Sequence, residues 1–265
     1  MRIATWNINS VRLRLPIVLK FLTEYEPDVL CLQETKSPDE FFPAEALADA
    51  GYAHQAINGM KGYNGVAILS KHALSDTGSH HWVKKDDSRH VAATLPNGVT
   101  VHNLYVPAGG DEPDPVKNEK FDHKLKFVKE MKTWFKQNAN PTSKMVLVGD
   151  LNIAPSEHDV WSHKQLLKIV SHTPVETELL EDSRQTAAFA DIARMAVPDE
   201  QKLYSWWNYR AKDWAASNKG RRLDHIWVTP DALANTKLHS YRVHLPLRGG
   251  WKPSDHAPIS VKVSV

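Results

Sequence analysis

The sequence has 265 residues, of which 42% are hydrophobic and 24% are charged, which is enough for a sizeable core in one large or two small domains. The net charge is only +2, so the overall charge does not indicate nucleic-acid binding. Only local clusters of basic residues could indicate it. A membrane-spanning helix is not expected, because no apolar stretch approaches about 18 residues.

A single cysteine, Cys31, lies inside an apolar run. It cannot form an internal disulfide, which favours a reducing compartment, and without a flanking positive group we expect a buried, inert thiol. The N-terminus opens directly into a strand pattern and lacks the apolar stretch of a signal peptide. We therefore expect a cytoplasmic protein.

The first half of the chain reads mainly as strands. Residues 2–8 alternate in polarity and predict a strand, and Pro16 then begins a helical stretch over 17–25. The dipeptide Asn97-Gly98 between two apolar runs is a strong hairpin signal. The remaining strands predicted here cover 29–33, 66–70, 90–95 and 99–106.

The second half begins with a long helix, predicted over 118–137 from apolar residues at helical spacing. A short buried strand over 145–148 follows, and 160–196 reads as mostly helical and irregular. Late strands are predicted over 223–228, 237–244 and 259–265. Because strands outnumber helices and helices separate only some of them, the pattern predicts a two-sheet α/β sandwich with outer helices.

Polar side chains stand at or just beyond the C-terminal ends of several apolar runs, where a sheet presents ligand-binding groups. Their oxygen and nitrogen atoms, without a cysteine, indicate one hard-metal site and hence phosphate chemistry. The four runs are Trp6-Asn7-Ile8-Asn9, Gln33-Glu34-Thr35, Gly149-Asp150-Leu151-Asn152 and Asp255-His256.

Each residue taken alone has an ordinary alternative. Glu34 could bind a metal or form a salt bridge, since a buried carboxylate needs a partner. Asp150 and Asn152 could face one way from a continuing strand or form a turn. His256 could be a base oriented by Asp224, or a histidine capping a turn.

Further candidates carry the same ambiguity. Asn7 could be a ligand or a turn former, and Tyr105 could donate to a phosphate or pack in the core. The stretch 206–222 interleaves aromatic and basic residues, which suits base stacking and phosphate contacts, but a core tryptophan pair with a solvated basic loop fits equally well. Its members are Trp206, Trp207, Tyr209, Arg210, Lys212, Trp214, Lys219, Arg221 and Arg222.

Seven motifs in order make the chain resemble the exonuclease III family of DNA repair nucleases, within the endonuclease/exonuclease/phosphatase superfamily. The resemblance implies a four-layer α/β sandwich of two packed mixed β-sheets flanked by helices, with residues 1–265 as a single domain. The motifs are Trp-Asn-Ile-Asn-Ser (6–10), Leu-Gln-Glu-Thr-Lys (32–36), Gly-Tyr-Asn-Gly-Val-Ala-Ile-Leu-Ser (62–70), Asn-Leu-Tyr-Val-Pro (103–107), Gly-Asp-Leu-Asn-Ile-Ala-Pro (149–155), Arg-Leu-Asp-His-Ile (222–226) and Ser-Asp-His-Ala-Pro-Ile (254–259).

The resemblance also implies roles for the site residues. Glu34 would be the main metal ligand, supported by Asn7 and Asp255. Asp150 would position or deprotonate the attacking water, although the choice between Asp150 and His256 as the base stays open. Of the remaining candidates, Asn152 and Tyr105 would contact the scissile phosphate, and His256, oriented by Asp224, would stabilise the charge that develops there.

The activity that the resemblance implies is Mg²⁺- or Mn²⁺-dependent hydrolysis of DNA phosphodiesters, 5′ to abasic sites and at 3′ ends, leaving a 3′-hydroxyl. The expected partner is double-stranded DNA with abasic sites or recessed or blocked 3′ ends. The protein is expected to be a monomer that associates with the nucleoid through its binding to DNA. Two alternatives remain: a relative that hydrolyses RNA or a small phosphoester, and a non-catalytic DNA-binding module.

Two departures from the family pattern bear on the exact activity. Ala108, followed by Gly109-Gly110, stands where relatives often carry Asn or Gln, so one phosphate or sugar contact is expected to be missing. His172 stands where many relatives carry Phe, and it is expected to narrow or repolarise the pocket for an abasic sugar. The other expected DNA contacts are Trp207, Trp214, Arg210 and Arg221.

Overall fold

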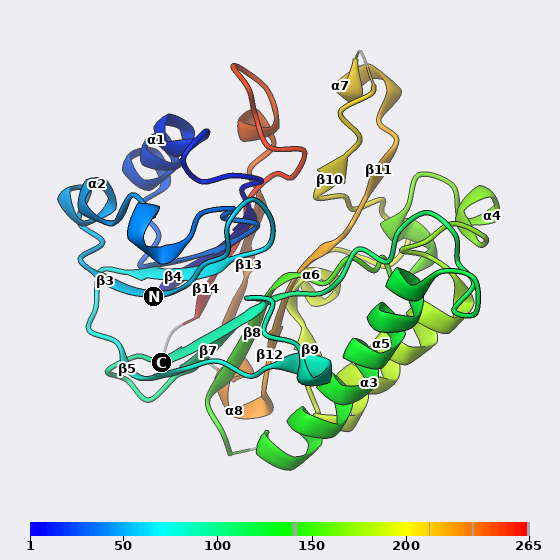
Figure 1. Ribbon diagram of the computed structural model, residues 1–265, viewed down its shortest axis with the longest axis horizontal. Coiled ribbons are helices and arrows are strands. Elements are labelled where there is room, and N and C mark those ends of the chain that lie inside the picture. The colour runs from blue at the N-terminus through cyan, green and yellow to red at the C-terminus, as the bar shows by residue number, and fades with distance from the viewer. Residues whose placement is uncertain (140–141, 212, 235, 264–265) are drawn as a thin grey trace.

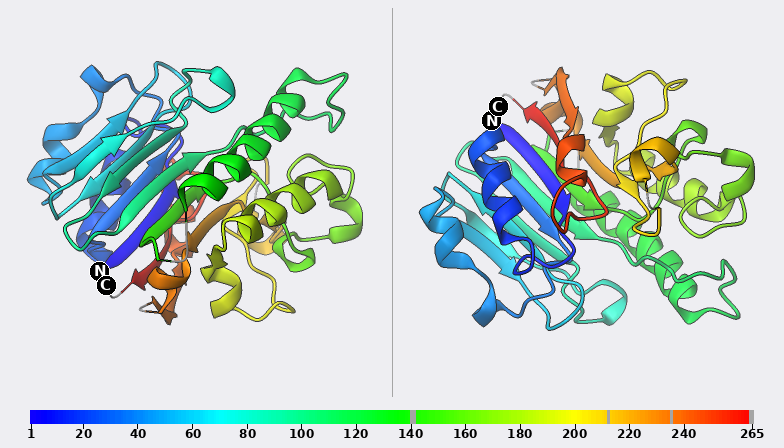
Figure 2. Two further views of the ribbon diagram at one scale, coloured as in Figure 1. Left: turned by 90° about the horizontal axis from the view of Figure 1, so that it is seen from below. Right: turned by 90° about the horizontal axis from the view of Figure 1, so that it is seen from above.

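The computed structural model describes residues 1–139, 142–211, 213–234 and 236–263. These residues form two six-stranded sheets that pack face to face, with helices on the outer faces (Figures 1 and 2). The predicted four-layer α/β sandwich is therefore confirmed. Lys212, part of the predicted basic stretch, and residues 264–265, the end of the last predicted strand, lie outside the described residues.

The first sheet contains both ends of the described chain. Its order is β13-β14-β1-β2-β4-β3, and β1 and β2 form its one parallel pair. Both terminal strands of the chain thus lie side by side in it. The bounds are β1 Arg2–Asn7, β2 Val29–Gln33, β3 His54–Asn58, β4 Val66–Ser70, β13 Thr236–Val243 and β14 Ile259–Val263.

The second sheet has the order β5-β6-β7-β8-β12-β9, again with one parallel pair, β7 and β8. A two-stranded ribbon of β10 (Trp206–Trp207) and β11 (Gly220–Arg221) projects beyond it (Figure 1). The bounds in the sheet are β5 Ser75–Gly78, β6 His90–Thr94, β7 Thr100–Tyr105, β8 Met145–Asp150, β9 Ala190–Asp191 and β12 Asp224–Val228.

The helices bury apolar faces against the outer surfaces of the sheets. Helices α1 (Leu15–Tyr25) and α2 (Ala44–Asp49) cover the first sheet, and α3 (Glu119–Asn138) and α5 (Pro174–Thr186) cover the second. The remaining helices are short: α4 His163–Leu166, α6 Ile192–Ala196, α7 Trp214–Ser217 and α8 Pro230–Leu233. None of the described helices is long and apolar enough to cross a membrane.

The main core lies between the two sheets, where strand residues from both meet. Strands such as β2, β4 and β8 are buried along their whole length, because the opposite sheet covers one face and helices cover the other. This explains why their sequences read as continuous apolar runs.

Strand direction brings the polar runs to one edge of the sandwich. The C-terminal ends of β1, β2, β7 and β8 meet the N-terminal ends of their antiparallel neighbours β12 and β14 at this rim. Gly149 allows β8 to reach it: a Cβ there would lie 1.9 Å from the Leu104 carbonyl oxygen, and φ is +140°. We call this edge the catalytic rim.

Most predicted strands and both long helices are confirmed within a few residues. The Asn97-Gly98 hairpin is present, with Gly98 at φ +81° and β6 paired antiparallel to β7. The strand predicted over 145–148 is longer than expected, since β8 continues through Asp150. Strands β3 and β5, at the edges of the two sheets, are not predicted by the sequence, because β3 is partly exposed and β5 is exposed along its whole length.

Candidate active site

Carboxylates and a carboxamide from three strands converge around Asp150. The Nδ2 atom of Asn7, at the end of β1, lies 2.8 Å from Asp150 Oδ2 and 2.9 Å from Glu34 Oε1. One amide thus bridges the carboxylates of the two sheets. Asn7 and Asp150 are buried, so these groups satisfy one another away from bulk water.

Glu34 follows β2 with a left-handed backbone conformation, φ +49°, which turns its side chain into the rim. Its Oε2 lies 2.8 Å from Lys36 Nζ. Burial raises the pKa of Glu34, but the Lys36 ammonium and the hydrogen bonds from Lys36 and Asn7 outweigh burial and lower it. The carboxylate is therefore ionised at neutral pH, as a metal ligand must be.

His256 is held by Asp224 in a buried pair. Its Nδ1 lies 2.8 Å from Asp224 Oδ2, an oxygen that also accepts a 2.6 Å hydrogen bond from Ser205 Oγ. Burial lowers the pKa of His256, but the carboxylates of Asp224 and Asp150 outweigh it and raise the pKa to about 10. The ring is therefore an imidazolium at neutral pH, with Nε2 3.7 Å from Asp150 Oδ2.

Asp150 stands between these groups. Burial raises its pKa, repulsion from Asp224 and Glu34 adds to this, and the His256 cation opposes it, leaving a pKa of about 7. Its Oδ1 accepts from the backbone N–H of Asn152 at 2.9 Å. A carboxyl group with this pKa can exchange a proton near neutral pH.

Asn152 and Tyr105 border Asp150 on the side of the second sheet. Asn152 adopts φ +53°, and its Nδ2 donates to the Val106 carbonyl at 2.9 Å. Tyr105 ends β7 in register with Asp150. Burial, together with the charges of Glu34 and Asp150, raises the pKa of Tyr105 well above its ordinary value, so its hydroxyl stays a donor.

Asp255 lies on the other side of the rim. Its Oδ2 accepts from Trp206 Nε1 at 2.9 Å, and its Oδ1 accepts from Asn9 Nδ2 at 3.2 Å. Burial raises the pKa of Asp255, but the His256 cation and these hydrogen bonds outweigh it and lower the pKa. Like Glu34, it is therefore an ionised oxygen donor.

One group of side chains at the rim brings its ligand atoms close enough together to hold a metal ion. Asp150, Asp224 and His256 offer ligand atoms within 4.8 Å of one another. His256 is protonated in this arrangement and engaged with Asp224, so it is a poor ligand until it loses its proton. The ionised carboxylates of Glu34 and Asp255 are hard oxygen donors that suit a hard divalent cation, while the Asn7 amide nitrogen faces Glu34 and Asp150 and its Oδ1 accepts from the Asn9 backbone N–H.

A cleft of about 370 Å³ opens at the rim. Trp206 and Arg221 from the β10–β11 ribbon form one wall, and the Arg221 guanidinium lies 5.3 Å from the Trp206 ring centroid. The floor contains most of the residues above: Glu34, Tyr105, Asp150, Asn152, Asp255 and His256. The sequence therefore identified the polar floor of the cleft but not several of its other lining residues, which include Asp111, Ile169, Val170, Ser171 and Asn208.

Of the five expected DNA contacts, only Arg221 lines the cleft, and Trp207, Trp214, Arg210 and His172 do not. Trp207 is 3% exposed and packs against Tyr204 and Trp214, while its neighbour Trp206 faces the cleft. Residues that alternate along a strand point to opposite faces, so the paired tryptophans could not both line it. Trp206 belongs to the predicted aromatic stretch but not to the expected DNA contacts, and its backbone bridge to His256 places it beside a residue that lines the cleft.

His172 is also turned inward. Its Nδ1 is 2.6 Å from the Ala154 carbonyl and its Nε2 is 2.8 Å from His163 Nδ1, while Ser171 lines the cleft in its place. The expectation that His172 narrows the pocket is wrong for this reason. Arg210 is exposed, and Trp214 is half-buried against Trp207 and the Arg248 guanidinium.

The comparison with known proteins defines the class first. The pattern of the endonuclease/exonuclease/phosphatase family matches residues 4–256, and the chain belongs to this family. Within it, the chain is 31% identical to exodeoxyribonuclease III of Haemophilus influenzae over 98% of both chains. The predicted membership of the exonuclease III family is thereby confirmed.

Solved structures agree over the full length of the chain. An AP endonuclease from Archaeoglobus fulgidus superimposes with a TM-score of 0.93 at 32% identity, covering 100% of both chains. A 3′ phosphatase from Neisseria, bound to a product DNA hairpin, superimposes with a TM-score of 0.91 at 32% identity over the same coverage. The DNA repair nuclease APEX1 of Danio rerio is 30% identical over 100% of this chain and 83% of its own length.

Proposed function

We propose that the chain is a DNA repair nuclease that hydrolyses phosphodiesters 5′ to abasic sites and at 3′ ends. The observation that carries this proposal is the convergence on Asp150 of Asn7, Glu34 and the Asp224-bound His256 cation, beneath a cleft. The names of its relatives, an exodeoxyribonuclease III, an AP endonuclease and a 3′ phosphatase, support it. We propose that residues 1–265 act as a single domain and as a monomer.

The proposed metal is Mg²⁺ or Mn²⁺. Glu34 would be its main ligand, with Asn7 and Asp255, because these residues supply oxygen donors and both carboxylates are ionised at neutral pH. When bound, the cation would offset negative charge on the phosphoryl oxygens.

The side chains around the metal would activate the attacking water, stabilise charge and orient the phosphate. Asp150 would accept the proton of the attacking water, because its pKa of about 7 suits a base at neutral pH. His256 would place a positive charge beside the phosphate, where charge develops in the transition state. The hydroxyl of Tyr105 and the carboxamide of Asn152 would donate to the phosphate oxygens and orient it.

A second hollow, of about 400 Å³, offers a path for the DNA backbone beside the cleft. It shares Tyr105, Ala108 and Gly110 with the cleft, and its outer part is basic. Ala108 presents only a methyl group there, so backbone contact on this side would fall to the cations. These are Lys85, Arg89 and Lys120, which line the hollow together with Glu119.

The test uses two labelled duplexes in Mg²⁺, one with an internal abasic site and one with a recessed 3′ end. We expect EDTA-sensitive cleavage of both. Cleavage of only the recessed end would limit the proposal to a 3′-end nuclease, and cleavage of neither would favour a small-phosphoester hydrolase or a non-catalytic module.

The control is Asp150→Asn, which keeps the shape of the side chain but removes the base. We expect cleavage to fall by at least about a thousandfold while DNA affinity stays within a few-fold, since the base acts only in the transition state. Turnover close to that of the wild type would remove Asp150 from the mechanism.

A further inference from the structure

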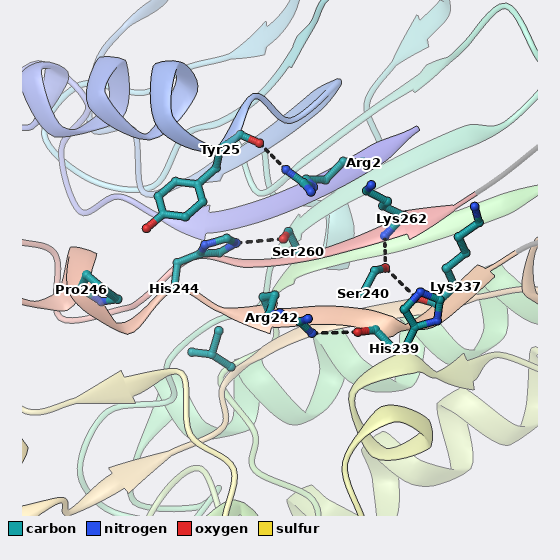
Figure 3. Close-up of a pocket in the computed structure, with 11 residues that line it drawn as sticks. Arg2, Tyr25, Lys237, His239, Ser240, Arg242, His244, Pro246, Ser260 and Lys262 are labelled. Carbon is teal, nitrogen blue, oxygen red and sulfur yellow. Dashed lines mark hydrogen bonds between the residues drawn. The ribbon is translucent and has the colours of Figure 1, made fainter.

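A second polar hollow, unrelated to the cleft, lies on the outer face of the first sheet. It measures about 580 Å³, a size typical of small-molecule sites, and shares no lining residue with the cleft. Figure 3 shows its floor on β13 and β14, with Tyr25 at the end of α1 and Arg2 of β1 at one side. We call it the β13 trough.

Three cations stand in one row across the floor. Lys262 of β14 is the register partner of Arg2 on β1 and of Lys237 on β13, so all three side chains leave the sheet on the same face. Like charges directly opposite one another destabilise a sheet. The row therefore costs stability in the free protein, and an anion placed over it would recover that cost.

A wide bulge in β13 brings further donors to the row. Lys237 pairs with Lys262 and Arg242 pairs with Ser260. The chain therefore advances five residues along β13 while it advances two along β14. Ser240, inside the bulge, accepts from the Lys262 backbone N–H at 2.8 Å and donates to the Lys237 carbonyl at 2.6 Å. The bulge thus returns Arg242 to the face that carries Lys237, as a fourth cation.

Among the described residues, no carboxylate lines the trough and none lies within 4.0 Å of the charged nitrogens of Arg2, Lys237, Arg242 or Lys262. The three cations of the row also border a neighbouring hollow, whose lining adds Glu24, Glu26 and Asp28; Glu24 lies 3.6 Å from Lys20, and Asp28 accepts the Arg2 backbone N–H at 2.5 Å. On the side of the trough the row faces no carboxylate of the described residues, so its positive charge is open to an anion there.

An aromatic wall borders the cations. The Tyr25 ring packs edge-on against the His244 ring with centroids 4.4 Å apart, and Pro246 continues the wall. His244 Nε2 is fixed 2.8 Å from Ser260 Oγ. Burial is the main cause that lowers the pKa of His244, to about 4, and the charges of Arg2 and Arg242 lower it further. The wall therefore stays neutral at physiological pH. A neutral ring surface beside clustered cations suits a ligand that joins a flat ring to an anion.

We propose that the β13 trough binds a nucleoside phosphate outside the catalytic cleft, with its phosphate over the Arg2–Lys262–Lys237 row and its base against Tyr25 and His244. Phosphate is the shared chemistry of a free nucleotide and of a DNA backbone. The aromatic wall favours the free nucleotide.

The experiment is calorimetric titration of the full chain in EDTA with deoxyadenosine 5′-monophosphate, inorganic phosphate and a blunt duplex. The variant is Lys237→Glu with Lys262→Glu. The matched control is Lys129→Glu with Lys136→Glu, two exposed lysines of α3. We expect the double variant to lose one bound nucleotide per chain, or to bind it at least about tenfold more weakly, while the control is unchanged.

Inorganic phosphate should bind the same place more weakly than the nucleotide, because it cannot contact the wall. Equal nucleotide binding by both double variants would overturn the proposal. A variant that loses affinity for the duplex but not for the nucleotide would also overturn it, and would make the trough a DNA backbone contact.

Two readouts separate this result from misfolding and from the proposed nuclease activity. Replacing lysines by glutamate in a like-charged row relieves repulsion, so the melting temperature without ligand should not fall. Cleavage of a duplex by the Lys237→Glu, Lys262→Glu variant should equal that of the wild type. Nucleotide should raise the melting temperature of the wild type by more than that of this variant.

Discussion

The two adjacent tryptophans of β10 have different surroundings and should have different roles. Trp206 faces the cleft and donates to Asp255, whereas Trp207 is buried among Tyr204, Trp214 and Ala257. Stacking on a base or a sugar is worth about 1–3 kcal/mol, and truncating a buried tryptophan costs about 3–5 kcal/mol. Substituting each tryptophan in turn should therefore affect DNA recognition through Trp206 and protein stability through Trp207.

We predict that Trp206→Ala weakens binding and cleavage of a damaged duplex by roughly tenfold or more with little change in unfolding free energy. Trp207→Ala should lower the unfolding free energy by about 3–5 kcal/mol and leave the cleavage rate per folded molecule nearly unchanged. Urea unfolding and single-turnover cleavage measure the two effects. Trp206→Phe, which keeps a ring, is the control, and a reversal of the two phenotypes would contradict the assignment.

At this scale the sequence predicts residue types better than side-chain directions. Glu34, Asp150, Asn152 and His256 were chosen from strand ends, and all four line the cleft, because strand polarity alone brings strand ends to one rim. The choice between Trp206 and Trp207 depends on the register of a two-residue strand. The inward turn of His172 depends on its contacts with Ala154 and His163, which no local pattern encodes.

At the scale of whole elements, a buried ion pair ties α3 and α5 to the catalytic rim. Lys124 Nζ of α3 lies 2.5 Å from Glu176 Oε1 of α5, and both side chains are fully buried. The same ammonium donates to the carbonyls of Asn152, at 2.8 Å, and Ala108, at 3.2 Å. Glu176 caps the start of α5 by accepting from Ser171 and Thr173.

We predict that Lys124→Met lowers the unfolding free energy by about 3–5 kcal/mol, because Glu176 would keep a buried charge without its partner. Cleavage should fall as well, since the Asn152 loop loses its anchor. Guanidinium unfolding and steady-state kinetics are the measurements.

The matched control is Lys126→Met on the same helix. Lys126 is exposed and pairs with Asp122, 2.6 Å away. Its replacement should change the unfolding free energy by less than about 1 kcal/mol. If Lys124→Met and Lys126→Met were equally stable, the pair would not anchor the rim.

The elements that the sequence identified are those whose burial is complete. Strands β2 and β4 carry unbroken apolar patterns because two layers cover them, whereas helix α3 shows a helical apolar repeat because only one of its faces is buried. Strand β5, Ser75–Gly78, is exposed along its length, and it exists only because it pairs with β6 at the sheet edge. Such pairing is a tertiary property, so local propensity cannot predict it.

For the whole molecule, buried histidines link stability to pH. His90 and His102 contact each other through their rings at 3.1 Å beneath α3, and burial lowers the pKa of His102 to about 4 and that of His90 well below its ordinary value. His102 is therefore neutral in the folded state at pH 5 and His90 is harder to protonate than a free histidine, whereas the unfolded chain takes up protons below about pH 6.5. Their contribution is therefore complete above pH 6.5 and is lost as the pH falls toward 4.

We predict that the unfolding free energy of the wild type falls from pH 7 to pH 5 by up to about 1.4 kcal/mol per pH unit for each of these histidines. His102→Asn should make the decline shallower, because asparagine places a polar atom near the former Nδ1 but does not titrate. His81→Asn, at an exposed histidine, is the control and should leave the slope unchanged. Equal slopes in all three proteins would show that this pair does not sense pH.

The charge distribution of the whole molecule leads to the last prediction. A net charge of +2 cannot draw DNA to the protein, so affinity must come from the local cations beside the cleft, such as Arg221, Arg89 and Lys120. Each phosphate they neutralise releases counterions, so the logarithm of the association constant should fall with the logarithm of salt by roughly 0.9 per contact. Lys120→Ala should reduce this slope by about one contact, and Lys129→Ala should leave it unchanged. Fluorescence anisotropy with the Asp150→Asn protein gives the slopes, and an affinity that does not respond to salt would mean that the DNA backbone does not follow this basic surface.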